Sequence, residues 1–565
     1  MSKAKWQLHP SAPDSHLAKF PHLPQLLVQC LYNRGVVTPD EVQRFLAGEY
    51  EEGSPFQISG VAEAVTRIRR AIRGDELIAV YGDFDADGVT ATVLLTTTLS
   101  GLGARIVPYI PHRVDEGYGL NQDAVRILAK QGVSLIVTVD CGTRAVAEIE
   151  AANRLGVDVI VTDHHSMGGQ LPAAVAVVNT KRMDCQYPFK GLSGVGIAYK
   201  VARALLLVDE QTPLGGQEPR LQVESLLDLV ALGTVADLSP LSGENRSLVK
   251  RGLAQLNQPR RPGLVALMEE AGVEPGAVTG ATIGYVLGPR LNAAGRVDDA
   301  MLSYRLLTAA SPAQARELAK LLERKNQDRR GMMLAAVEDA RVQVIHQVDE
   351  FLLFVTGDHY HEGVIGLAAQ RLCDEFYRPV VVVKTGEEES VASARSIDQL
   401  DISTTLDECA PLLSRYGGHS RAAGFTVGNE NLQALREKLQ RLAAEYLAGV
   451  ELLPTLHIDA EIPLASLKTE DFSVPEQLEP LGRGNPEPLL LSTGVEVRDS
   501  RTVGENHLKL TLTDGRVVWD GIAFGMSDRT ADLAPRIDVV YSPQVREWRD
   551  EEQLQLRIED FRPTF

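Results

Sequence analysis

The sequence predicts an α/β protein with two α/β lobes, the first built on a parallel sheet, and a small β-barrel at its C-terminal end. Two patterns predict this fold. Between residues 61 and 310, short apolar runs alternate with helix-length segments, and after residue 454 five strand-like runs follow one another. Apolar strands separated by helices are typical of a parallel sheet covered on both faces, whereas consecutive short strands favour a barrel.

The first 310 residues are expected to form a lead-in and one large domain. Residues 1–60 are predicted to be a helical lead-in, because Thr38, Pro39 and Glu41 make a capping box with proline in the first turn. Residues 61–310 are predicted to be the parallel-sheet domain. Its expected strands are 77–82, 104–110, 134–139, 157–162 and 174–178, and helices are expected at 89–99, 122–130 and 144–154.

The second half of the chain is expected to contain a connecting helix and two further domains. Ser311 and Gln314 form another capping box, so residues 311–350 are predicted to be a long helix, interrupted near Gly331. Residues 351–450 are predicted to be the smaller α/β lobe. Residues 451–565 are predicted to be five antiparallel strands, with a hairpin at Asp514 and Gly515, in a barrel such as an OB-fold.

Composition limits the class of protein but not its partner. The formal charge of −19 argues against a nonspecific polyanion binder, but only weakly, because a basic groove can lie on an acidic body. The five cysteines are scattered and never form a C-x-x-C pair, so neither a disulfide scaffold nor a structural zinc site is expected. No apolar run approaches the roughly 20 residues of a membrane span, and the N-terminus lacks a signal-peptide core. We therefore expect a cytoplasmic protein.

Acidic side chains, and in one place two histidines, follow several of the predicted apolar runs. They are Asp83, Asp85 and Asp87 after the first strand, Asp140 after the third, Asp163, His164 and His165 after the fourth, and Asp237 after the run ending at residue 236. A single aspartate in such a position is most often a helix cap. Several carboxylates gathered at one sheet edge, however, repel one another unless cations neutralise them. Oxygen ligands with an imidazole suit Mn²⁺ or Mg²⁺ better than Zn²⁺, and two such ions can activate water for attack on phosphorus.

At these residues the sequence resembles the DHH phosphoesterase superfamily, and within it the exonucleases that act on single-stranded DNA. The motifs in the first lobe are YGDFDADGVT (81–90), PHRVDEGYGL (111–120), TVDCG (138–142), DHH (163–165), ALGTVAD (231–237) and GPRLNAAGR (288–296). The second lobe carries YHEGVIG (360–366), SARSI (393–397) and GGHSRAAG (417–424), which look like the associated DHHA1 domain.

The resemblance implies a metal site and catalytic residues. It implies metal ligation by Asp85, Asp87, Asp140, His164 and Asp237. Asp83 is added because it lies on the same face of an extended segment as Asp85, and because Tyr81 stands where other subfamilies have a histidine. His164, His165 and Asp140 are the expected catalytic residues, with His165 orienting the phosphate or assisting the leaving 3′ oxygen.

The remaining motif residues are expected to bind substrate. Arg290, Asn292 and Arg296 are expected in a loop where guanidinium groups grip phosphate, although an ion pair between lobes is an alternative. Tyr118 is expected either to stack on a base or to pack within its loop. The full set is His112, Arg113, Tyr118, Arg290, Asn292 and Arg296 in the first lobe, and His361, Ser393, Arg395, Ser396, Gly417, Gly418 and His419 in the second.

The function that the resemblance implies is 5′→3′ exonuclease activity on single-stranded DNA, with release of 5′-mononucleotides during recombination and repair. Two Mn²⁺ or Mg²⁺ ions are the expected cofactors. Single-strand-binding protein and a helicase are the expected partners of a monomeric enzyme, and the C-terminal barrel is expected to bind the strand. Two alternatives are a DHH phosphodiesterase for oligoribonucleotides or cyclic dinucleotides, and a noncatalytic DNA-bound replication scaffold.

Overall fold

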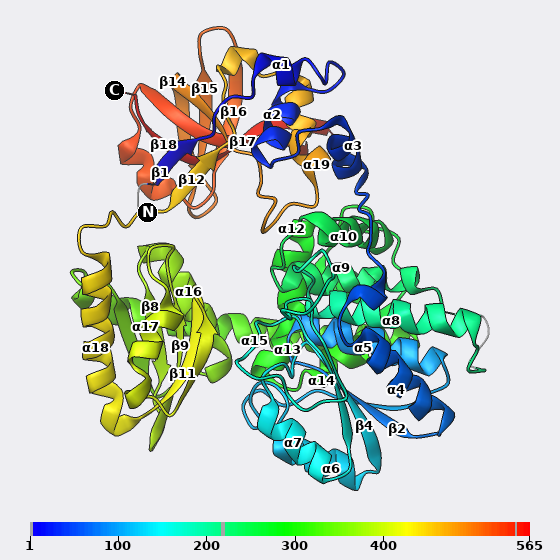
Figure 1. The fold of residues 1–565 in the computed structure, drawn as a ribbon. Helices are drawn as coiled ribbons and strands as arrows, with labels where there is room; N and C mark the ends of the chain where they lie inside the picture. The colour runs from blue at the N-terminus through cyan, green and yellow to red at the C-terminus, as the bar shows by residue number, and fades with distance from the viewer. Residues whose placement is uncertain (1–3, 216–220, 549–550, 565) are drawn as a thin grey trace. The chain divides into compact units, whose positions relative to one another are not determined.

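The computed structural model describes residues 4–215, 221–548 and 551–564, apart from the side chains of residues 546–551. The chain divides into two compact units, and Figure 1 labels many of the helices and strands named below. The first unit contains residues 47–329 and 479–486; the second contains residues 1–46, 330–478 and 487–565. Among the described helices, none combines the length and the apolar character that crossing a membrane requires.

A five-stranded parallel sheet lies at the centre of the first unit. The strands are β2 (Leu77–Tyr81), β3 (Arg105–Tyr109), β4 (Val133–Val139), β5 (Asp158–Thr162) and β6 (Ala176–Val178). Their order in the sheet is β3-β2-β4-β5-β6, and every neighbouring pair is parallel. All five strands predicted from the apolar runs are therefore confirmed, and their carboxyl ends meet at one edge.

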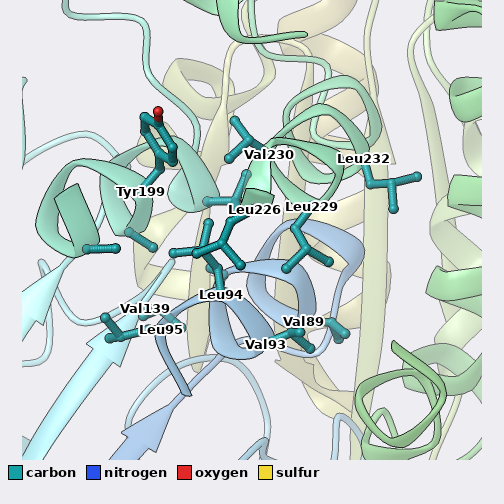
Figure 2. Close-up of a cluster of buried hydrophobic side chains, with 14 of the residues drawn as sticks. Val89, Val93, Leu94, Leu95, Val139, Tyr199, Leu226, Leu229, Val230 and Leu232 are labelled. Carbon is teal, nitrogen blue, oxygen red and sulfur yellow. The ribbon is translucent and has the colours of Figure 1, made fainter. Parts of the chain in front are cut away.

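Helices cover both faces of this sheet, as expected for fully apolar strands. Ile78 and Val80 pack with α4 (Val61–Arg73), α5 (Ala86–Gly101), α8 (Gly194–Gln211) and α9 (Leu227–Ala236). Ala79 and Tyr81 point to the other face and pack with α6 (Gln122–Lys130) and α7 (Val146–Arg154). Figure 2 shows α5 side chains, Leu94 among them, meeting Leu226 and Leu229. Each such aliphatic side chain contributes about 1.5–3 kcal/mol on burial, so this core fixes the helices that carry the acidic residues.

Further helices complete the first unit and correct one prediction. They are α10 (Gly243–Leu256), α11 (Pro262–Ala271), α12 (Gly280–Thr282), the π-helix η3 (Ile283–Leu287), α13 (Gly288–Val297) and α14 (Met301–Leu307). The segment 288–296, predicted to be a loop, is helix α13. Pro289 lies in its first turn, where proline costs no hydrogen bond, and the alanines that follow favour helix.

A single helix, α15 (Pro312–Val344), runs from the first unit into the second. The interruption predicted near Gly331 is wrong: Gly331 lies inside a continuous helix. The cost of one glycine in a helix is only about 1 kcal/mol. On the second unit's side, Ala336, Val337 and Ala340 of this helix are buried in the hydrophobic core of that unit.

The α/β lobe of the second unit is a mixed five-stranded sheet with three helices. The sheet order is β10-β11-β9-β8-β7. The strands are β7 (Leu353–Gly357), β8 (Val380–Lys384), β9 (Glu389–Arg395), β10 (Arg415–His419) and β11 (Ala422–Gly428); the helices are α16 (Glu362–Phe376), α17 (Ile402–Glu408) and α18 (Asn429–Leu447). The prediction of a smaller α/β lobe in this part of the chain is therefore confirmed.

The C-terminal segment forms the predicted five-stranded barrel. Its strands are β14 (Leu490–Val503), β15 (His507–Thr513), β16 (Val518–Ala523), β17 (Arg536–Trp548) and β18 (Glu551–Pro563). They pair in the order β14-β15-β16-β18-β17, and β14 also pairs with β17, which closes the barrel. The pairs are antiparallel except for β16 with β18, which is parallel, so the prediction of a wholly antiparallel barrel is wrong in this pair. Phe524 is 53% exposed on this domain, whereas Tyr541 is buried in its core.

Residues 1–46 of the N-terminal lead-in belong to the second unit, and its residues 47–60 belong to the first. The lead-in contains the predicted α3 (Pro39–Ala47), together with α1 (Asp14–Leu17) and α2 (Gln25–Asn33). It also contains a strand that the sequence analysis missed, β1 (Lys5–Leu8), which pairs in parallel with β12 (Thr455–Ile458). The Trp6 indole donates to Asp560 over 2.8 Å. The lead-in is therefore tied to the C-terminal part of the chain rather than being a separate helical segment.

Candidate metal centre

The predicted acidic residues converge at the carboxyl edge of the parallel sheet. Three overlapping sets of side chains each bring their ligand atoms within 4.8 Å of one another. These sets are Asp83, Asp85 and Asp140; Asp140, His164 and His165; and Asp87, His164 and Asp237. All six predicted ligands therefore belong to one cluster. Asp237 reaches the cluster from the C-terminal end of helix α9, so the apolar run before it is a helix and not a strand.

Backbone amides fix the orientation of the first carboxylates. Asp85 is the N-cap of α5, and its side chain accepts hydrogen bonds from the amides of Asp87 and Gly88, each over 3.0 Å. Asp87 accepts from the amides of Gly194 and Val195 at the start of α8, over 2.6 and 2.8 Å. Both carboxylates satisfy amides that a helix start leaves unpaired. The alternative reading as a helix cap is thus correct for Asp85, whereas Asp87 lies within α5 and accepts from the first amides of a different helix.

Two residues of the cluster region have left-handed backbone conformations. Asp140 has φ of 61°, and Leu238, directly after Asp237, has φ of 59°. For residues other than glycine this conformation costs about 1–2 kcal/mol. The amide of Asp140 donates to the Thr162 carbonyl over 3.0 Å, which holds the turn against neighbouring strand β5. Strain of this kind is concentrated at functional sites, in agreement with a site at this edge.

The two histidines have different surroundings. The Nε2 atom of His164 lies 3.1 Å from Asp140 Oδ1, 4.0 Å from Asp87 Oδ2 and 3.9 Å from Asp237 Oδ1. His165 instead contacts Asp163, whose carboxylate lies 2.8 Å from His165 Nδ1. His164 thus faces the carboxylate cluster, while His165 is oriented beside it.

Asp163 organises the turn that carries both histidines. Its carboxylate accepts hydrogen bonds from the amides of Thr143, His164 and His165 over 2.7–3.0 Å. Burial alone would raise the pKa of Asp163, but the hydrogen bond and charge of His165 hold it below its usual range. No separate role of Asp163 is predicted from the sequence, although its place at the head of the DHH motif is a signal that it has one.

The cluster carries more negative charge than a cation-free site tolerates. Burial and the charge of Asp85 raise the pKa of Asp83 to about 8. Burial raises the pKa of Asp237 to about 6. Burial and neighbouring carboxylates raise the pKa values of Asp87 and Asp140 well above the usual range. These carboxylates are fully ionised at neutral pH only if cations neutralise them.

The donor set fits divalent cations that prefer oxygen. Burial lowers the pKa of His164 to about 3, so its imidazole is neutral and its lone pair is available to a metal. Asp83 Oδ1, Asp140 Oδ1 and His164 Nε2 are buried atoms that lack hydrogen-bond partners, and such atoms are rare unless a ligand satisfies them. Carboxylates with one imidazole are the ligands that Mn²⁺ and Mg²⁺ accept.

Substitution of Gly194 is expected to damage the cluster without touching a ligand. A Cβ atom at this position would lie 2.4 Å from Asp140 Oδ1 and 2.6 Å from Asp140 Cβ. We expect Gly194→Ala to displace Asp140 and to weaken Mn²⁺ binding by about 10–100-fold, the usual cost of disturbing the support of a metal ligand. Titration calorimetry with Mn²⁺ measures the effect, and Gly169→Ala, where a Cβ meets nothing within 4 Å, is the control. Equal affinities of the two variants would contradict this packing argument.

The predicted residues of segment 111–120 lie beside the cluster. The Arg113 guanidinium lies over the Phe84 ring, 4.2 Å from its centroid. The Tyr118 hydroxyl is 3.2 Å from His165 Nδ1, and the side chain is 57% exposed. His112 instead lies 2.8 Å from Asp115. Tyr118 is therefore exposed at the site and not packed within its loop.

The predicted residues of α13 have internal partners. The side-chain oxygen of Asn292 accepts from the amide of Ala86 over 2.7 Å, which supports the start of α5. Arg290 forms an ion pair with Glu323 over 2.7 Å, as the alternative reading expected, but both residues belong to the first unit. Arg296 is half-buried. Gly295 approaches the cluster loop so closely that a Cβ would lie 2.1 Å from the Phe84 carbonyl.

Tyr81 does not face the cluster. Its ring is buried, and its hydroxyl donates to the Gly119 carbonyl over 2.9 Å. The residue that replaces the histidine of other subfamilies is thus part of the core on the α6 face. Asp83, by contrast, is in the cluster.

In the second unit, most of the predicted residues lie on adjacent strands. Arg395 donates to the Ser393 hydroxyl over 2.9 Å, and the register aligns Ser393 with Gly424 and Gly417 across β9, β11 and β10. The same face continues from Arg395 through Ala422 to His419. Gly418 alternates with Gly417 and lies on the opposite face.

The other two residues of this set have local bonds. His361 is the N-cap of α16, with Nδ1 accepting from the Gly363 amide over 3.0 Å. Ser396 is buried and donates to the Leu400 carbonyl over 2.7 Å. The hydroxyl of Ser396 therefore stabilises a turn, whereas His361 stands at the start of the helix that packs on β9.

Comparisons with known proteins agree with this architecture. Three family models match: "DHH family, N-terminal domain" at residues 77–234, "DHHA1 domain" at residues 342–445, and "RecJ OB domain" at residues 458–560. The chain is 36% identical over 570 residues to the single-stranded-DNA-specific exonuclease RecJ of Bacillus subtilis, covering 99% of this chain and 71% of that protein. It is 34% identical over 562 residues to RecJ of Escherichia coli, covering 96% of each.

A solved structure has the same fold over nearly the whole chain. The crystal structure of RecJ from Thermus thermophilus in complex with Mn²⁺ matches with a TM-score of 0.85 at 28% identity, covering 99% of this chain and 80% of that one. A second structure of that protein, in complex with Mg²⁺, matches with a TM-score of 0.80. The identities to the curated relatives and the extent of the alignments establish that the chain belongs to the RecJ family of single-stranded-DNA-specific exonucleases.

Proposed function

We propose that this protein is an exonuclease that hydrolyses single-stranded DNA from its 5′ end and releases 5′-mononucleotides. The observation that carries the proposal is the cluster of buried carboxylates and His164, whose ligand atoms lie within 4.8 Å of one another in overlapping sets. The names of the curated relatives supply the preference for single-stranded DNA. Those names state neither the polarity nor the mononucleotide product, so these two points are what the experiment must test.

The cluster residues have distinct tasks in this proposal. Asp85, Asp87, Asp140, His164 and Asp237 hold two Mn²⁺ or Mg²⁺ ions, with Asp83 as a further carboxylate. When bound, such ions lower the pKa of water and neutralise charge on the phosphate that is attacked. The Gly194 and Val195 amides hold Asp87, and Asp163 holds the turn of His164, so the ligands are oriented before substrate binds.

His165 is the proposed proton-handling group. Burial alone would lower its pKa, but the hydrogen bond to Asp163 and the charges of Asp163 and Asp83 raise it above its ordinary value. The imidazolium is therefore more populated at a given pH than in an unperturbed histidine, and it can donate a hydrogen bond to a phosphate oxygen or a proton to the departing 3′ oxygen. Tyr118, exposed and 3.2 Å from His165 Nδ1, is available for stacking on a base.

The strand end is proposed to bind residues of the second unit. Ser393 and Arg395 lie on one face of β9, with His361 at the start of α16. A Cβ on Gly366 of α16 would come within 3.0 Å of both the Ser393 hydroxyl and the Arg395 guanidinium, so a helix and two phosphate-binding side chains meet there. Helix starts and arginine both favour phosphate groups, and we propose that this site binds the 5′-phosphate.

The 5′-phosphate site makes a quantitative prediction for Arg395. We expect Arg395→Ala to raise KM for a 5′-phosphorylated strand by about tenfold, because a charge-assisted hydrogen bond contributes about 1.5–3 kcal/mol. The effect on a 5′-hydroxyl strand should be much smaller. Steady-state kinetics on the two strands measures it, with the exposed Arg371→Ala of α16 as control. An equal loss on both strands would place Arg395 outside this role.

The experiment that tests the proposal uses strands blocked at one end. A single-stranded DNA with a 3′ block should be degraded with Mn²⁺ to 5′-mononucleotides, whereas the same strand with a 5′ block should remain intact. A duplex of the same sequence should resist degradation. Release of nucleotides from the 3′ end would contradict the proposed polarity. Cleavage of neither strand would contradict the proposed substrate.

The two alternatives are less well supported. The small-substrate phosphodiesterases are expected to lack a C-terminal barrel, and this chain has a closed one. A noncatalytic scaffold is expected to have lost ligands, and here every predicted ligand is in the cluster. We further propose a cytoplasmic, monomeric enzyme in recombination and repair, receiving single strands from a helicase and single-strand-binding protein.

A further inference from the structure

Positive side chains flank the acidic cluster at two ends. Arg113 lies at the Asp83–Asp85 end. Burial lowers the pKa of its guanidinium, and the charges of the two aspartates offset part of this effect. At the Asp237 end lie two other cations, Lys181 and Arg483, which the family motifs do not assign to the site. Lys181 interacts electrostatically with Asp237, Asp163 and Arg483. A nucleic-acid strand that crosses the cluster from one end to the other therefore passes cations on both sides.

The turn of residues 163–165 holds Lys181 at the edge of the sheet. It lies three residues beyond β6, and its amide donates to the side-chain oxygen of Asn179 over 2.8 Å. The amide nitrogen of Asn179 in turn donates to the His165 carbonyl over 2.9 Å. This bridge fixes the backbone of Lys181 next to the histidine turn, while its side chain is exposed. The next residue, Arg182, is instead engaged with Asp184 over 2.6 Å.

Arg483 is held next to Asp237 by a separate turn. Residues 479–486 belong to the first unit, although the chain on either side belongs to the second. The Arg483 carbonyl accepts from the Leu241 amide over 2.6 Å, and its guanidinium donates to the Leu238 carbonyl over 3.4 Å. A Cβ on Gly484 would lie 3.3 Å from Pro240. The turn thus packs on the segment that follows Asp237, and Arg483 is exposed there.

The two cations are available to a ligand. Within the described residues, neither Lys181 nor Arg483 forms an ion pair with a carboxylate at 4.0 Å or less. Arg290 of α13, by contrast, is already engaged in an ion pair with Glu323. An ammonium and a guanidinium that share an exposed edge match the charge and hydrogen-bonding capacity of a phosphodiester.

We propose that Lys181 and Arg483 bind the phosphate that follows the scissile phosphate on its 3′ side. This inference rests on the proposed function: release of 5′-mononucleotides leaves a single nucleotide on the 5′ side of the cut, so the next internal phosphate lies on the 3′ side. The two residues are positioning residues: they hold the uncut strand on the 3′ side so that the scissile phosphate remains over the cluster. Electrostatic compensation of the carboxylates is the competing explanation for two cations at this edge.

A single neutral linkage in the DNA separates the two explanations. The probe is a 5′-phosphorylated deoxythymidine 12-mer, compared with the same strand carrying a methylphosphonate at the second linkage only. The variants are Lys181→Ala and Arg483→Ala. The controls are Lys130→Ala and Arg154→Ala, exposed cations in the last turns of α6 and α7, which lead into the opposite edge of the sheet.

We expect Lys181→Ala and Arg483→Ala each to lower kcat/KM on the normal strand about tenfold, mostly through a higher KM. Each variant should also reduce the salt dependence of DNA binding. On the methylphosphonate strand, the variants and the wild type should have equal kcat/KM, because the contacted charge is already absent. Both control variants should match the wild type on both strands. The Mn²⁺ affinity of Lys181→Ala and Arg483→Ala should not fall.

Two results would overturn the inference. One is full activity of Lys181→Ala and Arg483→Ala on the normal strand. The other is the same loss on both strands, which would indicate charge compensation of the cluster. Failure of the wild type to degrade the normal strand is a different result, because it would reject the proposed function itself.

Discussion

Asp140→Ala is expected to lose nearly all nuclease activity, by about 10³-fold or more in kcat, the scale at which removal of a transition-state charge-stabilising group acts. Asp140 belongs to two of the three ligand sets and lies 3.1 Å from His164 Nε2. Among the described residues, no other residue belongs both to the ligand set with Asp83 and to a set with the histidines. Its removal therefore affects both proposed ion positions at once.

Digestion of a 5′-labelled single strand with Mn²⁺ measures this loss. Asp123→Ala is the matched control, because Asp123 is an exposed aspartate in the first turn of α6 that belongs to none of the three ligand sets. Thermal denaturation of both variants checks that they are folded. Because Asp140 has a left-handed backbone and a buried, repelled carboxylate, its substitution should not destabilise the metal-free protein. A folded Asp140→Ala enzyme that keeps more than about a tenth of the activity would contradict the assignment.

Metal binding is expected to depend steeply on pH and to stabilise the protein. Without metal, the pKa of Asp83 is raised to about 8 and that of Asp237 to about 6. The folded state thus binds these protons more tightly than the unfolded chain, whose aspartates titrate near 3.9. Stability from these groups is fully present below about pH 4 and is lost as pH rises through the folded-state values. The metal-free protein should therefore be less stable at pH 8 than at pH 6.

Added Mn²⁺ is expected to reverse this loss. Divalent ions displace the protons and neutralise the ionised carboxylates, so Mn²⁺ should bind more tightly at pH 8 and should release protons on binding. At a Mn²⁺ concentration about 100 times Kd, the stabilisation is about 2.7 kcal/mol, which corresponds to a rise of about 4–5 °C in the Tm of a unit of this size. Differential scanning calorimetry with EDTA or Mn²⁺ at the two pH values measures both trends. An equal rise in Tm at pH 6 and pH 8 would contradict proton-coupled binding by these carboxylates.

The sequence predicted the sheet of the first unit because buried parallel strands are continuous apolar runs. The runs ending at Tyr81, Val139 and Thr162 each became a strand, and their order placed the following acidic residues at one edge. Helical segments rich in glycine were harder to predict. The 288–296 segment and the region around Gly331 contain residues that disfavour helix locally, and tertiary packing decided in favour of helix.

The ligand set could be predicted from the sequence, but its supporting residues could not. Asp83, Asp140 and Asp237 follow recognisable runs, whereas Gly194 and Asn292 contact the cluster through pairings more than 100 residues apart in the chain. Long-range pairing of this kind leaves no local pattern. For the same reason the turn containing Arg483 gave no indication that it packs beside Asp237, since the residues around it belong to the other unit.

Counting bound Mn²⁺ tests the central claim, that these carboxylates and His164 form a centre for two divalent ions. Equilibrium dialysis at pH 8 against Mn²⁺, followed by atomic emission measurement of metal per chain, gives the number directly. The account predicts about two ions per wild-type chain and one or fewer per Asp140→Ala chain. No binding by the wild type, or the same number in both proteins, would contradict it.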